Sequence, residues 1–416
     1  IRVLIEEKVK ILDQVREIQV NDRMSVTLSI GIGRTAKTIA ESEVFAKQAL
    51  DMALGRGGDQ AAIKTNNGFE FYGGVSMGVE RHTKVKTRII ANSLIEAIEG
   101  ADDVYIMGHR NSDLDSVGSA VGLAAAIKRL GKDAYAVIDK STTLSIQLYD
   151  YLNEKDKSGI FTTPTQAIEN FKENSLLIIV DTHNPQIVDV PELLEDAKKL
   201  VIIDHHRKMV NYIDTSMIFH HEPYASSASE MVTELLQYFG DAGKISSFHA
   251  EALLAGITLD TKNFTLRTGV RTFEAAAFLR KLGADTVNVK TLFASSINSY
   301  KQKTEIVSSA WIYRNCAVAS TDKTTEEMRI VAAQAADELL GVSDVSASFV
   351  LSKTGNDEIS LSGRSLGAIN VQLIAESLGG GGHQTMAGAQ LKGVSFEEAT
   401  EKLKAAIDKY YNDLNT

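Results

Sequence analysis

The sequence predicts an α/β protein in three parts: a doubly wound, mostly parallel sheet, a second, smaller α/β domain after it, and a partial α/β unit before it. Between Asp103 and Ser295, short apolar runs typical of buried strands alternate with helical patterns. A similar alternation resumes after Ala310. With 416 residues, of which 44% are hydrophobic, the chain is long enough for two or three packed cores.

Composition excludes several classes of protein. The net charge of −10 argues against an electrostatic track for long nucleic acid. The single cysteine, Cys316, allows neither an intrachain disulfide nor a thiolate zinc cluster, and indicates a reducing compartment. No apolar run approaches the roughly 20 residues of a membrane span, so we expect this fragment to be soluble. Because the chain opens at Ile1 without an initiator methionine, we expect anchoring segments upstream of it.

Residues 1–83 form the first expected unit. Ser25–Gly33, with the sequence SVTLSIGIG, is predicted to be a strand, Ile39–Leu54 a helix, and Gln60–Gly73 a β-rich segment. This pattern resembles the C-terminal half of a GGDEF domain. The triplet Gly57-Gly58-Asp59 follows the helix, whereas the catalytic loop of that family lies upstream of the strand. The resemblance therefore implies a degenerate remnant that regulates or packs, rather than a cyclase.

Residues 84–295 are predicted to form the catalytic domain. It begins with a connecting helix over Val85–Ile98, which we also consider a contact for a homodimer. The expected strands are Val104–Met107, Ala134–Ile138, Leu176–Val180 and Leu200–Ile203, with a helix over Ser116–Leu130. The stretch from Lys290 to about Ala310 is polar, poor in core residues and predicted to be helical, and within it residues 296–310 are expected to link this domain to the next.

Residues 311–416 are predicted to form the second domain. Its expected strands are Trp311–Thr321, Ser346–Leu351 and Glu358–Ser362, and its expected helices are Glu326–Leu340, Asn370–Leu378 and Phe396–Tyr411. Four consecutive glycines, Gly379–Gly382, allow a close backbone approach and point N–H groups at an anion, although a tight turn would need no ligand. His383, directly after this loop, and Arg364, at the end of a predicted strand, favour recognition of a phosphate or a base.

Histidines and carboxylates follow the predicted strands. The set comprises His109, Asp113, Asp115, Asp181, Asp204, His205, His206 and, after an expected strand over Leu253–Leu259, Asp260. The C-terminal ends of parallel strands share one edge of a sheet, so these residues should meet there. A single Asp in such a place is most often a helix cap or turn residue, but the joint set suits two divalent ions. Without cysteine, and with more carboxylates than imidazoles, Mn²⁺ is favoured over Zn²⁺, with Mg²⁺ as the alternative.

Four other histidines lack such companions. His183, His220, His221 and His249 have no carboxylate set at a strand end, and we expect them to be surface or core residues.

The ordered set of motifs resembles the DHH phosphoesterase superfamily. His109 with Asp113 and Asp115, then Asp181, then Asp204-His205-His206, then Asp260 match its successive motifs, and Gly380-Gly381-Gly382-His383 resembles the signature of the DHH-associated C-terminal domain. The resemblance covers about residues 98–411. With a GGDEF remnant upstream, the chain is similar to the GdpP-type phosphodiesterases, membrane-anchored bacterial enzymes that hydrolyse cyclic di-AMP.

This resemblance implies a role for each residue. His109 and Asp113 would bind one Mn²⁺, Asp115, His205 and Asp260 the other, and Asp181 both. Asp204 would orient a ligating histidine, and His206 would face the substrate phosphate as a catalytic group that either stabilises charge or protonates the leaving oxygen. Arg364, Gly380, Gly381, Gly382 and His383 would bind the cyclic dinucleotide. The resemblance also implies linear pApA as the product and, for the full-length protein, a place at the cytoplasmic face of the bacterial membrane.

Two other functions remain open. Another DHH enzyme, acting on short oligonucleotides or on the 3′,5′-bisphosphate pAp, would share every catalytic residue. A non-catalytic regulator that binds cyclic dinucleotides is the third hypothesis, and the complete ligand set argues against it. The preference for adenine over guanine cannot be read from these residues.

Overall fold

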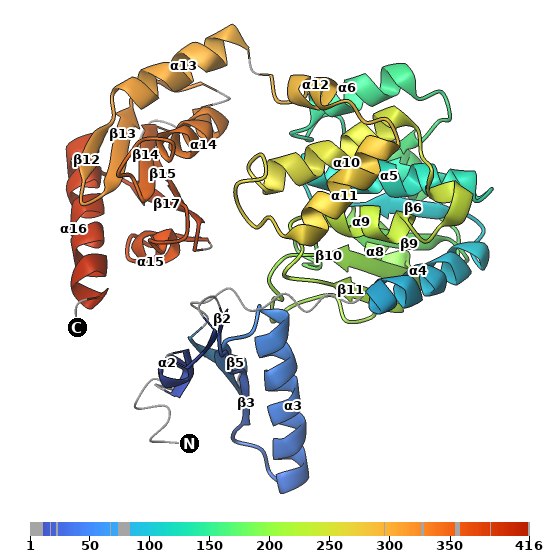
Figure 1. Ribbon diagram of the computed structural model, residues 1–416, viewed down its shortest axis with the longest axis horizontal. Coiled ribbons are helices and arrows are strands. Elements are labelled where there is room, and N and C mark those ends of the chain that lie inside the picture. Colours follow the sequence, from blue (N-terminus) through green and yellow to red (C-terminus); the bar gives the residue numbers. More distant parts are fainter. Residues whose placement is uncertain are drawn as a thin grey trace. The chain divides into compact units, whose positions relative to one another are not determined.

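The structure is a computed structural model that describes residues 11–16, 18–21, 24–66, 68–73, 84–294, 296–325, 328–353, 358–382 and 384–414. The chain divides into two compact units, Ile1–Phe293 and Ala294–Thr416. Each unit combines helices with at least one sheet (Figure 1), which confirms the predicted α/β class.

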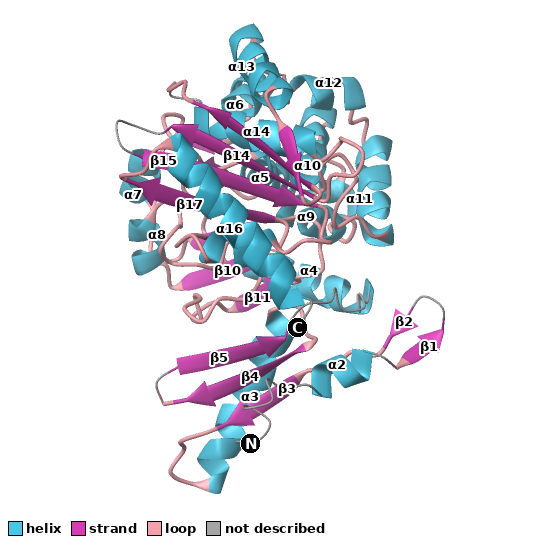
Figure 2. Cartoon of the chain, turned by 90° about the vertical axis from the view of Figure 1, so that its left-hand side faces the viewer, coloured by secondary structure: helices cyan, strands magenta, loops and turns pink. Residues whose placement is uncertain are grey.

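The first unit begins with a small α/β layer. Its sheet, in the order β3-β4-β5, pairs β3 (Ile30–Gly33) parallel to β4 (Gln60–Thr65) and β4 antiparallel to β5 (Gly68–Gly73). Helix α3 (Ile39–Gly55) packs on this sheet (Figure 2), and Gly31 permits the close approach because a Cβ there would lie 2.2 Å from the Ala46 carbonyl oxygen. Before this layer lie α2 (Ile11–Arg16) and the paired strands β1 (Gln19–Asn21) and β2 (Met24–Ser25). The predicted strand over Ser25–Gly33 is thus shorter, because only its last four residues join the sheet.

The rest of the first unit is built on six parallel strands. Their order is β8-β7-β6-β9-β10-β11, with neighbouring strands parallel throughout. In chain order this is 3-2-1-4-5-6, the arrangement of doubly wound sheets in which ligands bind where the order reverses. The strands are β6 (Val104–Met107), β7 (Ala134–Val137), β8 (Phe161–Thr162), β9 (Leu176–Val180), β10 (Lys199–Asp204) and β11 (Ile218–His221).

Helices cover both faces of this sheet. Alternate strand residues point to opposite sides: Ile106 joins a core with α5 and α10, whereas Met107 joins a core with α8. The helices are α4 (Lys84–Glu99), α5 (Leu114–Arg129), α6 (Ile146–Lys155), α7 (Pro164–Asn170), α8 (Pro191–Asp196), α9 (Ala228–Leu236), α10 (Ser247–Asp260), α11 (Val270–Lys281) and α12 (Thr286–Thr291), with a 3₁₀ turn over Gly240–Gly243.

The predicted strand over Leu253–Leu259 is wrong, because these residues belong to α10. This helix is apolar on nearly every side, since it lies between α5, α9 and α11, so its sequence shows no helical period. Gly118 and Gly122 of α5 allow the close contact. A Cβ at Gly118 would lie 2.4 Å from the Ala252 carbonyl oxygen of α10.

The second unit holds a six-stranded sheet in the order β12-β13-β14-β15-β17-β16. Only β13 and β14 are parallel. Helices α13 and α14 cover one face, and α15 and α16 the other, with α16 crossing the strands diagonally (Figure 2). The elements are α13 (Ile297–Ser308), β12 (Trp311–Tyr313), β13 (Cys316–Thr321), α14 (Met328–Leu339), β14 (Ala347–Lys353), β15 (Glu358–Ser365), α15 (Val371–Glu376), β16 (Gly381–Gly382), β17 (Met386–Lys392) and α16 (Phe396–Leu414).

Two expectations for this region change. The predicted strand Trp311–Thr321 is a hairpin, because Arg314 and Asn315 adopt left-handed backbone conformations with φ of 45° and 59°. The segment 296–310 is helical as predicted, since it contains α13, but this helix lies within the second unit, where Ile306 is buried against α14.

Among the helices that the structure describes, none is long and apolar enough to cross a membrane.

Candidate metal centre

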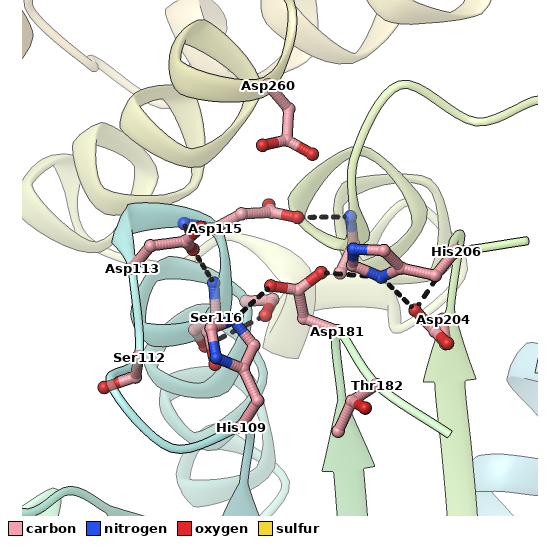
Figure 3. Close-up of polar contacts among 12 residues, drawn as sticks. His109, Ser112, Asp113, Asp115, Ser116, Asp181, Thr182, Asp204, His206 and Asp260 are labelled. Carbon is pink, nitrogen blue, oxygen red and sulfur yellow. Dashed lines mark hydrogen bonds and ion pairs between the residues drawn. The ribbon is translucent and has the colours of Figure 1, made fainter. Parts of the chain in front are cut away.

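The predicted polar residues gather at the C-terminal ends of three neighbouring strands. His109 follows β6, Asp181 follows β9, and Asp204 ends β10. The strand order reverses between β6 and β9, so His109 and Asp181 flank the reversal point. Their side chains point toward one another, and Asp260 approaches from the helices above the strand ends (Figure 3).

His109 and Asp113 are fixed by local hydrogen bonds. His109 Nδ1 donates to the carbonyl oxygen of Arg110 (2.9 Å), which leaves Nε2 facing Asp181 Oδ2 at 3.3 Å. Asp113 is the N-cap of α5, and its Oδ1 accepts from the backbone N–H groups of Asp115 (2.9 Å) and Ser116 (3.1 Å). The second oxygen of Asp113 thus remains available to a ligand.

Asp115 is completely buried against the first turn of α9. Its carboxylate accepts from the backbone N–H groups of Ala228 (2.7 Å) and Ser229 (2.8 Å). Gly256 of α10 makes room for this contact, since a Cβ there would lie 2.7 Å from Asp115 Oδ1 and 2.2 Å from Ser229 Oγ. The positive end of the α9 dipole stabilises the buried charge.

Asp181 occupies the centre of the cluster. Its backbone is left-handed (φ 60°), and its N–H donates to the carbonyl oxygen of Ile203 (3.0 Å). Such a conformation is uncommon outside glycine, although Asp and Asn tolerate it best. It places one carboxylate oxygen toward His109 and the other 3.4 Å from His205 Nε2 and 3.6 Å from His206 Nδ1. Both carboxylate oxygens of Asp181 therefore face histidines, one on the His109 side and one on the His205–His206 side.

His205 faces three carboxylates. Its Nε2 lies 3.2 Å from Asp260, 3.4 Å from Asp181 and 3.8 Å from Asp115. These distances are long for hydrogen bonds. They would suit atoms that bind one metal ion. Two metal–ligand bonds of about 2.1 Å at right angles would place the two ligand atoms ~3 Å apart. Asp260 reaches this point from the end of α10, not from a strand end.

Asp204 binds two histidines instead of facing the cluster centre. Its Oδ1 accepts from the N–H (3.1 Å) and Nδ1 (2.9 Å) of His206, and its Oδ2 pairs with Nδ1 of His183. His183 is buried, and its Nε2 accepts from the N–H of Met209 (3.0 Å). His183 was expected to be a surface or core histidine, and it is buried. Its pairing with Asp204 was not predicted. Its position two residues after a strand-end aspartate was the available signal.

Three groups have ligand atoms within 4.8 Å of one another: His109, Asp113 and Asp181; Asp115, His205 and Asp260; and Asp181, His205 and His206. Asp181 belongs to the first and the third of these groups, and His205 to the second and the third.

The electrostatics of this cluster favour cations. Burial, followed by the charges of Asp181 and Asp260, raises the pKa of Asp113 to about 6 and that of Asp115 well above its ordinary range. Burial opposes ionisation of Asp181 as well, yet the neighbouring histidines lower its pKa. Several buried carboxylates in one place repel one another unless positive charge is supplied. The residues present therefore fit divalent metal ions.

The expected substrate residues lie in the second unit. Arg364 of β15 is largely buried and pairs through Nε with Asp337 Oδ1 at 3.3 Å. Gly381 and Gly382 form the edge strand β16 beside β17, and Gly380 precedes it. His383 lies outside the described residues. A Cβ at Gly380 would lie 2.1 Å from the Gly388 carbonyl oxygen, whereas one at Gly381 would meet nothing within 4 Å.

Family models match three parts of the chain. Residues 103–257 match the DHH family, N-terminal domain, and residues 315–413 match the DHHA1 domain. The chain belongs to the DHH phosphoesterase family. Residues 1–71 match the GGDEF domain of cyclic-di-AMP phosphodiesterase GdpP-like proteins, so the recognised order of domains is confirmed.

Individual relatives align with nearly the whole chain or share its fold. The chain is 44% identical over 411 residues to the cyclic-di-AMP phosphodiesterase GdpP of Geobacillus thermodenitrificans, and 42% identical to that of Bacillus subtilis. These alignments cover 98% and 97% of this chain but 62% of each relative. The crystal structure of an exopolyphosphatase-related protein from Bacteroides fragilis shares the fold, with a TM-score of 0.66 and 22% identity over 79% of this chain and 98% of that one.

Proposed function

We propose that this chain is a metal-dependent phosphodiesterase that hydrolyses cyclic di-AMP to linear 5′-pApA. The buried histidine–carboxylate clusters that meet at Asp181 support the reaction class. The identity of the substrate is inferred from the GdpP-like unit over residues 1–71, which comes before the DHH domain. The relatives that share this order are named as cyclic-di-AMP phosphodiesterases.

We assign the ion-binding residues as two sets that meet at one carboxylate. His109 and Asp113 would hold the first ion, Asp115, His205 and Asp260 would hold the second, and Asp181 would be a ligand shared by the two sets. Oxygen-rich ligation without sulfur favours Mn²⁺, with Mg²⁺ as the alternative. When bound, two such ions acidify an attacking water and neutralise charge on the phosphoryl oxygens.

We assign to His206 the protonation of the oxygen that leaves the phosphate. Its ring is held through Nδ1 by Asp204, and the side chain remains 45% exposed, so Nε2 is available to substrate. Burial lowers the pKa of His206, but the Asp204 carboxylate more than compensates and raises that pKa above its ordinary value. His206 can therefore bring a proton to the oxygen that departs.

Recognition of the second phosphate or a base is assigned to the second unit. Gly381 presents open backbone on an edge strand, where N–H groups are available to an anion. Arg364, Gly380, Gly382 and His383 complete this proposed set. Arg364 would exchange its Asp337 partner for a phosphate.

Two properties of the whole protein belong to the same proposal. We expect a homodimer, because α4 exposes Val85 (67%) and Ile89 (59%). We also expect the full-length protein to sit at the cytoplasmic face of the bacterial membrane through segments beyond this chain, as the resemblance to the GdpP-type family implies. Light scattering of the purified chain would measure the first of these.

The decisive experiment is a substrate panel. The chain, with Mn²⁺, is incubated with cyclic di-AMP, cyclic di-GMP, pApA and pAp, and the products are separated by chromatography. We expect cyclic di-AMP to give pApA fastest. Faster cleavage of pApA or pAp, with cyclic di-AMP intact, would favour the short-oligonucleotide or pAp hydrolase. Tight binding of cyclic di-AMP without any product would favour a regulator.

A further inference from the structure

The C-terminal turn of helix α3 contacts the segment that follows the DHH histidines. The N–H of Lys208 donates to the carbonyl oxygen of Gly55, the last residue of α3, at 3.0 Å. In return, the guanidinium of Arg56 donates to the carbonyl oxygen of Lys208 (3.4 Å). Both backbone polar groups of Lys208 are therefore held by the GdpP-like GGDEF unit, only two residues after His206.

Gln60 fixes the shape of this turn. Its buried side-chain amide donates to the carbonyl oxygens of Ala53 (3.2 Å), Arg56 (3.3 Å) and Gly58 (3.1 Å). That leaves Oε1 as an acceptor for the guanidinium of Arg207, at 3.1 Å. One residue thus both closes the end of α3 and binds the residue next to His206.

The Gly57-Gly58-Asp59 triplet also takes part in this contact. The carbonyl oxygen of Gly57 accepts from the hydroxyl of Tyr224, which follows β11, at 2.6 Å. Gly57 and Gly58 have φ of 100° and 65°, which glycine adopts without strain. The triplet that resembles a cyclase motif is in this structure a turn that docks on the DHH domain.

Hydrogen bonds continue from this contact into the candidate metal centre. Met209, the next residue along the chain, donates its N–H to Nε2 of His183 (3.0 Å). His183 pairs with Asp204, and Asp204 holds His206. The α3 turn is therefore joined to His206 through Lys208–Met209, His183 and Asp204.

The contact between the α3 turn and residues 207–209 contains two arginines, which apolar packing alone would not favour. Arg56 and Arg207 are both more than half withdrawn from solvent, and neither forms an ion pair within the described part of the chain. Burial, and then the charge of Arg207, lowers the pKa of Arg56 to about 10. Two like charges placed together cost stability. The Arg56 guanidinium also lies over the ring of Phe71, 4.0 Å from its centroid, which offsets part of this cost, and the hydrogen bonds to Arg207 and Lys208 fix the position of the 207–209 segment.

We propose that the α3 turn, residues 55–60, is a positioning device for the phosphodiesterase site, with Gln60 and His183 as positioning residues for His206. The proposal rests on the function proposed above only in that His206 serves catalysis. It gives the GGDEF remnant a role in place of cyclisation: the remnant orients the DHH histidines.

The test uses the full chain with two variants and a matched control. Gln60→Met removes the bonds to Arg207 and to the α3 carbonyls, and Tyr224→Phe removes only the hydroxyl that binds Gly57. Glu43→Gln, on the exposed side of α3, is the control. The readouts are kcat and KM on cyclic di-AMP, metal titration, and ¹H–¹⁵N histidine spectra of the metal-free protein, with His183 and His206 assigned from His→Gln variants.

We expect Gln60→Met to lower kcat about three- to tenfold, the range for loss of the single bond by which Gln60 reaches Arg207, with KM and metal binding unchanged. Tyr224→Phe should act in the same direction. In both variants the His183 and His206 resonances should move, and in Glu43→Gln they should not. If Gln60→Met does not fold, Tyr224→Phe decides alone.

Unchanged histidine spectra and unchanged kcat in the folded variants would overturn the proposal and leave the turn as packing. A wild-type chain that does not cleave cyclic di-AMP would instead contradict the proposed function. The histidine spectra would still test the positioning contact in that case, because they need no substrate.

Discussion

The two large sheets of this protein use their strand ends differently. In the large sheet of the first unit all six strands are parallel, so β6, β9 and β10 end on one edge and bring His109, Asp181 and Asp204 together. In the second unit most strands are antiparallel, and consecutive strand ends point in opposite directions. The parallel sheet therefore gathers charged side chains from distant parts of the sequence. The antiparallel sheet instead offers an edge strand of glycines, Gly381–Gly382, whose backbone is accessible.

This contrast predicts two kinds of loss. Changes at the parallel strand ends should abolish ion binding and chemistry, because each side chain there completes a shared cluster. Changes at the glycine edge should weaken substrate binding and leave the ions in place. Variants at the two places should therefore separate ion binding from substrate binding.

Asp181→Asn should reduce turnover by about three orders of magnitude or more, since its carboxylate is shared by both ion sites. Asn tolerates the left-handed backbone at this position, so the fold should persist. Rates on cyclic di-AMP, with calorimetric titration of Mn²⁺, would measure the effect. Asp196→Asn, at an exposed position on α8, is the control. Near-normal turnover of Asp181→Asn would contradict the two-ion assignment.

Gly256→Ala should destabilise the fold by roughly 1–3 kcal/mol and weaken ion binding, because the new methyl group overlaps Asp115 and Ser229. Thermal unfolding and metal titration would show both effects. Gly100→Ala is the matched control, since the nearest atom to its Cβ would be the Glu96 carbonyl oxygen, at 3.4 Å. Equal behaviour of the two variants would mean that α10 can move away from Asp115 at little cost.

Asp204→Asn should lower kcat about 10- to 100-fold, as is usual for residues that orient a metal-site histidine. The carboxylate accepts on both oxygens, from His206 and from His183, whereas an amide has only one acceptor. Metal binding should persist. Loss of both ions in the titration would instead make Asp204 a direct ligand.

In the second unit, Gly381→Val should raise KM for cyclic di-AMP about tenfold without changing the melting temperature or ion binding. Its side chain would enter open space, so the fold has no reason to respond. Gly380→Ala is the structural counterpart and should lower stability, because its Cβ would overlap the Gly388 carbonyl oxygen. A generic phosphodiester should be cleaved by Gly381→Val at the wild-type rate. An equal loss of turnover on both substrates would contradict the assignment of substrate recognition to the glycine edge and of chemistry to the parallel strand ends.

The smallest effect concerns Cys316, in the core of the second unit. Burial raises the pKa of its thiol to about 12, so the reactive thiolate is scarce at pH 8. Alkylation by iodoacetamide should be at least about a hundredfold slower in the native protein than in denaturant, with activity unchanged. Rapid native alkylation would show that this core opens readily.

Much of this architecture follows from local sequence. The runs before His109, Asp181 and Asp204 are short, wholly apolar and followed by polar residues, which is how buried parallel strands end. The order of strands and helices, and the convergence of most of the cluster, could therefore be predicted. The substrate-binding residues stay predictions, and His383 among them lies outside the described residues.

Other features could be decided only by tertiary structure. Leu253–Leu259 is apolar enough for a buried strand or a buried helix, and only its contacts with α5 and α9 make it helical. His183 and Asp204 are separated along the chain, so neither one's neighbours reveal that the two side chains pair. Gly256 and Gln60 likewise matter through atoms that approach them from other elements. The sequence by itself determined which residues stand at the strand ends, because that depends on short-range pattern. Their partners were decided by packing, because a hydrogen bond depends on where two backbones meet and not on either segment alone.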